Sequence, residues 1–161
     1  MEKSSNSDAD TLSHLKLRLT GKVVILGIGN TLRSDDGIGS LLATRIQGKA
    51  PYIVYDASVS PENYLGKIIK DKPDTILLID AVDFGGLAGE FRIFEGEDIQ
   101  TVNFFSTHDA SLSLAINYLK SNLKVNVFVL AIQPKILVFA DTLSPQICKT
   151  LEKLEGWFMH G

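Results

Sequence analysis

The stretch KVVILGIGNTLRSDDGIG, residues 22–39, decides the fold of this chain. Residues 22–28 form an apolar run rich in β-branched side chains, which is typical of a strand buried on both faces. Glycines and the adjacent aspartates Asp35 and Asp36 interrupt the run, and apolar residues at helical spacing follow them. The stretch therefore predicts a buried strand that leads through an acidic loop into a helix.

The same alternation of strand and helix continues through the rest of the chain. Strands are expected, in chain order, at residues 22–28, 52–55, 75–79, 89–94 and 125–132. Most are uniformly apolar, whereas the alternating pattern of 89–94 (GEFRIF) is typical of an edge strand with one exposed face. The predicted fold class is therefore α/β: a single three-layer α/β/α domain whose twisted five-stranded sheet is mostly parallel, with one antiparallel edge strand.

The length of 161 residues suits one domain with a short extension. We assign residues 21–161 to the domain and the polar residues 1–20 to an N-terminal extension, which we expect to be partly disordered. Within that extension, Leu12, Leu15 and Leu19 could form one amphipathic turn that packs on the domain.

The composition argues against several classes of protein. The net charge is −3 and no basic stripe is present, so neither nucleic acid nor an anionic membrane surface is an expected partner. The single cysteine, Cys148, excludes an internal disulfide and suits a reducing compartment. No apolar run reaches the roughly 18 residues of a membrane span, and no signal peptide is evident. We expect a cytoplasmic protein that is a monomer.

Three carboxylates are expected at one edge of the predicted sheet. Asp36 follows the first strand, Asp56 ends the second and Asp80 ends the third. The carboxyl ends of parallel strands meet at one edge, and α/β proteins bind their ligands there. Together with His108, near the start of a predicted helix, Asp36 and Asp80 form a candidate three-ligand site for a transition metal with open coordination positions.

Each of these side chains also has a purely structural interpretation. Asp36, or Asp35 beside it, could cap the following helix and complement its dipole. His108 taken alone would more often be structural, whereas Asp80 closes a buried strand, where a carboxylate without a partner is costly and a functional role is favoured. The loop does not suit phosphate, because the third glycine of a dinucleotide fingerprint would fall at Leu32 and negative side chains occupy the loop.

Four short segments form a recognisable set. They are, in chain order, GIGNTLRSDDGIG at 27–39, YDASVSPEN at 55–63, ILLIDAVD at 76–83 and STHD at 106–109. As a set they resemble the [NiFe]-hydrogenase maturation endopeptidases. The segments AIQP at 131–134 and LEGW at 154–157 are most similar to the hydrogenase 3, or formate hydrogenlyase, branch of that family. The resemblance covers residues 22–157, and the N-terminal extension has no counterpart in it.

The resemblance implies one specific proteolytic cleavage. The enzyme would remove the C-terminal peptide from the nickel-loaded large-subunit precursor of a [NiFe] hydrogenase, and the substrate would bring the Ni²⁺. The implied metal ligands are Asp36, Asp80 and His108, with both aspartates also catalytic and with Asp56 as the base or orienter of an attacking water. Imidazole and carboxylate both suit Ni²⁺, and the isolated protein could hold another divalent ion or none. The family's Asp-Gly-Gly turn after the second strand appears here as Asp56-Ala-Ser.

Two other functions stay open on the sequence alone. The first is a nickel-binding chaperone that uses the same three ligands without proteolysis. The second is an esterase similar to peptidyl-tRNA hydrolase, whose fold also begins with a strand that leads into Gly-x-Gly-Asn. The acidic pair Asp35–Asp36 and the lack of a basic surface weaken that interpretation. No H-E-x-x-H or G-x-S-x-G motif is present, so an ordinary zinc peptidase or serine hydrolase is not expected.

Overall fold

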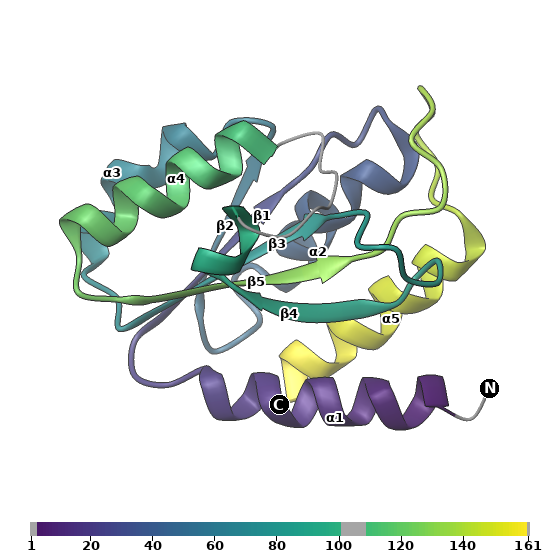
Figure 1. The fold of residues 1–161 in the computed structure, drawn as a ribbon, viewed down its shortest axis with the longest axis horizontal. Helices are drawn as coiled ribbons and strands as arrows, with labels where there is room; N and C mark the ends of the chain where they lie inside the picture. The colour runs from purple at the N-terminus through teal and green to yellow at the C-terminus, as the bar shows by residue number, and fades with distance from the viewer. Residues whose placement is uncertain (1–2, 101–108, 161) are drawn as a thin grey trace.

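The structure is a computed structural model that describes residues 3–100 and 109–160, and strands alternate with helices along it (Figure 1). The strands are β1 (Val23–Ile28), β2 (Ile53–Ser58), β3 (Thr75–Ala81), β4 (Phe91–Glu95) and β5 (Asn126–Ile132). The helices are α1 (Lys3–Arg18), α2 (Ile38–Ile46), α3 (Leu65–Asp71), α4 (Asp109–Asn122) and α5 (Pro145–His160). All five predicted strands are present. Within the described ranges, no helix has both the length and the apolar character that crossing a membrane requires.

The sheet has the strand order β2-β1-β3-β5-β4. β1 pairs in parallel with both β2 and β3, β3 pairs in parallel with β5, and β4 pairs antiparallel with β5. The prediction of a mostly parallel sheet with one antiparallel edge strand is therefore confirmed. From β1 the chain passes to β2 on one side and then crosses to β3 on the other, so the strand order reverses between β1 and β3. Open α/β sheets bind ligands at this kind of switch point.

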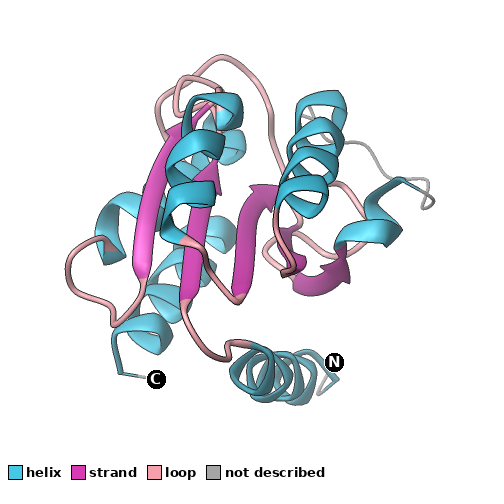
Figure 2. Ribbon diagram, turned by 90° about the vertical axis from the view of Figure 1, so that its left-hand side faces the viewer, coloured by secondary structure: helices cyan, strands magenta, loops and turns pink. Residues whose placement is uncertain are grey.

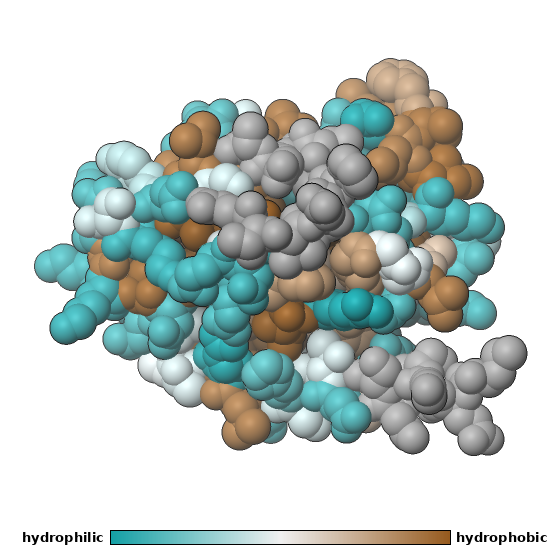
Figure 3. Space-filling model, in the orientation of Figure 1, coloured by the Kyte–Doolittle hydropathy of each residue, from teal (hydrophilic) through white to brown (hydrophobic). Residues whose placement is uncertain are grey.

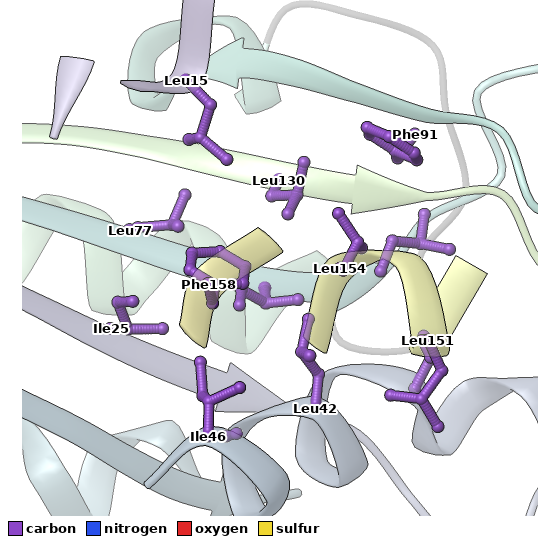
Figure 4. Close-up of a cluster of buried hydrophobic side chains, with 14 of the residues drawn as sticks. Leu15, Ile25, Leu42, Ile46, Leu77, Phe91, Leu130, Leu151, Leu154 and Phe158 are labelled. Carbon is purple, nitrogen blue, oxygen red and sulfur yellow. The ribbon is translucent and has the colours of Figure 1, made fainter. Parts of the chain in front are cut away.

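Helices cover both faces of the sheet, which confirms the three predicted layers (Figure 2). On one face α2, α5 and the end of α1 pack on the sheet, and side chains such as Leu42 and Phe158 fill the core (Figure 4). On the other face α3 and α4 contribute a second core that includes Ile68 and Leu112. Successive residues of a strand point to opposite faces, and β1 illustrates this because its side chains divide between the two cores.

The N-terminal helix α1 is longer than the single turn expected from the sequence. Leu15 is fully buried in the core beneath α2 and α5, which anchors the helix. The Arg18 guanidinium forms an ion pair with Glu95 of β4 and lies 4.5 Å from the ring centroid of Phe128. The hydrogen bond from Arg18 holds the pKa of the Glu95 carboxyl below its ordinary value. Helix α1 thus packs against the edge strand, while the division into an extension of residues 1–20 and a domain of 21–161 stays a prediction.

Candidate active site

Glycines allow the loop between β1 and α2 to pack closely against the carboxyl ends of β1 and β3. A Cβ atom on Gly39 would lie 2.3 Å from the last carbonyl oxygen of β1 and 2.3 Å from that of Ile79 in β3. A Cβ atom on Gly29 would lie 2.4 Å from the carbonyl oxygen of Asp36. The 3-10 turn Ser34–Gly37 consequently packs against β3. The acidic loop is thereby held at the point where the strand order reverses.

Replacement of Gly39 by alanine is expected to destabilise the protein by about 2–3 kcal/mol, because the new methyl group meets backbone oxygens of two strands that cannot rotate away. The measurement is the free energy of unfolding in urea. Gly66→Ala on α3 is the matched control, since its Cβ would have nothing within 4 Å. That control should be neutral or stabilising by up to about 1 kcal/mol. Equal stabilities of the two variants would contradict the close packing described for Gly39.

Asp36 is buried in the turn before α2, with 1% of its surface exposed. Its carboxylate and its carbonyl oxygen both lie within hydrogen-bonding distance of the Asn30 amide, at 3.3 and 3.2 Å. No side-chain hydrogen bond caps the turn or α2, and the N-cap of α2 is Gly37. The structure therefore does not support the interpretation of Asp35 or Asp36 as a helix cap.

Asp80 is fully buried near the carboxyl end of β3, where it pairs in register with Ala131 of β5. The strand continues to Ala81, two residues further than the sequence predicts. Leu78 and Val82 belong to the core beneath α3 and α4, so the alternation of a strand places Asp80 on that same face. Asp36 therefore lies in the turn that follows β1, and Asp80 lies near the end of β3. These are the two strands between which the strand order reverses.

Asp56 lies on a different face of the sheet. Its carboxylate accepts hydrogen bonds from Ser40 Oγ at 2.7 Å and Thr44 Oγ1 at 3.1 Å, both on α2, and from the Ser58 amide at 2.9 Å. In register, Asp56 pairs with a residue of β1, and that strand separates it from β3. The structure thus brings Asp56 to α2 and does not bring it to Asp80.

The third predicted ligand, His108, lies outside the described residues. Within residues 3–100 and 109–160, no group of three or more histidine, cysteine, aspartate or glutamate side chains has the arrangement of a metal site. The predicted triad requires His108, so its assembly stays a prediction.

Asp35 has a role that the sequence analysis did not find. Its fully buried carboxylate accepts hydrogen bonds from the amides of Lys135 and Ile136, both at 2.9 Å. It also accepts bonds from the amide and the hydroxyl of Ser144, at 2.7 and 2.8 Å. Asp35 therefore ties the acidic loop to the segment that follows β5, and it holds in place the turn that carries Asp36.

Gln133 is a second residue to which the sequence analysis gave no structural role. Its side-chain oxygen accepts hydrogen bonds from the amides of Phe84 and Gly86, at 2.9 and 3.0 Å. Its side-chain nitrogen donates to Asp83 at 3.0 Å. Gln133 thereby fixes the shape of the loop that follows Asp80. The only indication of its importance in the sequence is its place in the AIQP segment.

The fold and its acidic edge define the class: a doubly wound α/β protein with buried carboxylates at the switch point of its sheet. The HycI family model, described as hydrogenase maturation protease, matches residues 37–159. The hydrogenase 3 maturation protease of Escherichia coli (strain K12) is 35% identical over 144 residues, covering 86% of this chain and 92% of the relative. The chain belongs to the HycI family of hydrogenase maturation proteases.

Solved structures give the same result. The crystal structure of a [NiFe] hydrogenase maturation protease HycI from Thermococcus kodakarensis KOD1 matches with a TM-score of 0.81 and 31% identity, covering 91% of this chain and 97% of that one. The solution structure of an endopeptidase HycI from Escherichia coli matches with a TM-score of 0.74 and 30% identity, covering 86% and 90%. The chain is accordingly a hydrogenase maturation endopeptidase, a hydrolase. This assignment sets aside the nickel chaperone and the esterase.

Proposed function

We propose that this endopeptidase removes the C-terminal peptide from the nickel-loaded large-subunit precursor of a [NiFe] hydrogenase. The relatives named above are proteases of hydrogenase maturation, which supports a hydrogenase precursor as the substrate. The observation that carries the proposal is the burial of two carboxylates, Asp36 and Asp80, on the two elements that flank the switch point. Ligands of α/β sheets bind at such a point.

In this proposal Asp36, Asp80 and His108 recognise the nickel that the substrate carries. Carboxylate oxygen and imidazole nitrogen both suit Ni²⁺, and three protein ligands leave positions for the ligands of the precursor itself. A divalent cation that binds both carboxylates would offset part of the cost of burying their charges. Once bound, the metal can polarise the scissile carbonyl or lower the pKa of an attacking water.

Asp56 has a positioning role in the proposal. Its hydrogen bonds to Ser40 and Thr44 fix the first turns of α2 against β2. The turn that carries Asp36 leads directly into α2. Asp56 therefore orients the acidic loop through α2, on the face of the sheet opposite to the one that carries Asp80. The role of Asp56 as base or orienter of an attacking water stays a prediction.

The nickel content of the precursor provides the test. We expect the purified enzyme to shorten a nickel-loaded precursor and to leave the nickel-free precursor intact, because the nickel completes the recognition site. The mass of the large subunit before and after incubation is the readout. Cleavage of both forms at equal rates would remove nickel recognition from the proposal, and failure to cleave either form would overturn the proposed activity.

A further inference from the structure

Four apolar side chains are exposed next to the acidic loop. They are Leu32, Ile136, Val138 and Phe139, with exposed fractions of 56%, 39%, 61% and 83%. We call them the apolar patch. Hydrophobic atoms gather over the segment that follows β5, at the upper right of the space-filling view (Figure 3). Scattered apolar residues are common on protein surfaces, but a contiguous group of them often marks a binding surface.

Backbone hydrogen bonds hold the patch in a fixed arrangement. An isolated parallel bridge pairs Arg33 with Ala140. The Ala140 amide donates to the carbonyl of Leu32 at 2.9 Å, and the Ser34 amide donates to the carbonyl of Ala140 at 2.7 Å. Because the pairing is parallel, Leu32 and Phe139, the residues that precede the bridge, lie next to each other. The two segments therefore form one platform that presents apolar side chains outward.

The same platform is continuous with the candidate active site. Asp35 accepts hydrogen bonds from the amides of Lys135 and Ile136, and Asp36 is the next residue. Ile136 therefore belongs both to the apolar patch and to the hydrogen-bonded group that holds the acidic loop. The platform therefore adjoins the turn that carries Asp36.

We infer that the apolar patch is a docking surface for the body of the large-subunit precursor, an inference that rests on the proposed function. The residues from Ile136 to Ala140 carry no charge, so the matching surface of the precursor is apolar. A stable dimer buries roughly 20–30 residues on each side, far more than these four side chains offer. The patch thus suits a partner that is held at a second place as well, and a substrate bound at the acidic loop meets that condition.

Kinetics on the nickel-loaded precursor test the inference. Two variants remove apolar side chains from the patch: the single change Phe139→Ser and the double change Val138→Ser with Phe139→Ser. Each should raise KM about tenfold or more while kcat stays within about twofold. The reason is that the lost contact forms before the chemical step and persists through it. Leu17→Ser is the matched control, because Leu17 is 75% exposed and belongs to α1, a helix that lies away from the loop between β1 and α2 (Figure 1). Its KM should not change. An unchanged KM in both patch variants would overturn the inference.

A binding measurement separates this inference from the proposed activity. The affinity of the precursor is compared for Asp80→Asn and for Asp80→Asn combined with Phe139→Ser, neither of which needs to cleave. Weaker binding of the second variant supports docking even if the wild-type enzyme fails to cleave, a failure that would count against the proposed function alone. Sedimentation of the free enzyme tests whether a second copy of this chain, and not the precursor, occupies the apolar patch. A wild-type dimer that Phe139→Ser converts to a monomer, with precursor affinity unchanged, would assign the patch to a second copy and overturn the inference.

Discussion

Replacement of Asp80 by asparagine is expected to lower the processing of a nickel-loaded precursor on the order of a hundredfold or more. The asparagine keeps the size of the buried side chain but removes the negative charge and the carboxylate ligand. The proposed site would then offer the nickel two strong ligands in place of three. The readout is the single-turnover rate at which the mature large subunit appears, measured by mass.

Two controls make this expectation specific. Asp74→Asn changes an aspartate just before the other end of β3, where its carboxylate accepts a hydrogen bond from the Lys22 amide, and processing should be unaffected. Asp36→Glu keeps a carboxylate with a longer reach and should retain part of the activity that Asp36→Asn loses. Thermal unfolding of each variant verifies that the fold survives. Wild-type processing by a folded Asp80→Asn protein would exclude Asp80 from the site.

The largest loss of stability is expected at Asp35. Asp35→Asn places an amide group where four donors converge, and at least one buried donor must lose its acceptor. Hydrogen bonds to a charged acceptor are strong, and unsatisfied buried donors are costly, so the free energy of unfolding should fall by on the order of 3–5 kcal/mol. Urea unfolding provides the measurement.

Asp141→Asn is the matched control for Asp35, because Asp141 lies exposed on the same segment that Asp35 anchors. Its free energy of unfolding should stay within about 0.5 kcal/mol of the wild type. A further readout is the protection of the Ile136 and Ser144 amides from hydrogen exchange, which Asp35→Asn should lower and Asp141→Asn should not. Unchanged protection in Asp35→Asn would show that the carboxylate does not anchor the segment.

The sheet could be predicted because its signals are local. Apolar runs such as 22–28 and 75–79 mark buried strands wherever they occur, and the alternation of 89–94 distinguishes the edge strand. The ends of strands are less well marked, since β3 continues through Asp80 although a charged residue usually ends a buried run. The expected burial of Asp80 is nevertheless confirmed, because its side chain is fully buried.

The details of the site depended on contacts that are distant in sequence. The partners of Asp35 lie about a hundred residues further along the chain, and no local pattern connects them with the acidic loop. The sequence also grouped Asp56 with Asp36 and Asp80 because all three follow or end strands. Which face each carboxylate occupies depends on the phase of the two-residue period, and that phase separates Asp56 from Asp80.

The bonds from Asp35 to residues 135–144 have a consequence for biosynthesis. A ribosome releases the chain from its N-terminus, so the acidic loop emerges long before the segment that anchors it. Until that segment is made, the loop lacks four of its hydrogen-bond donors. A chain that lacks residues 135–144 would therefore carry the aspartates without the contacts that hold their loop, and on the proposed function it would acquire proteolytic competence only after those residues are made.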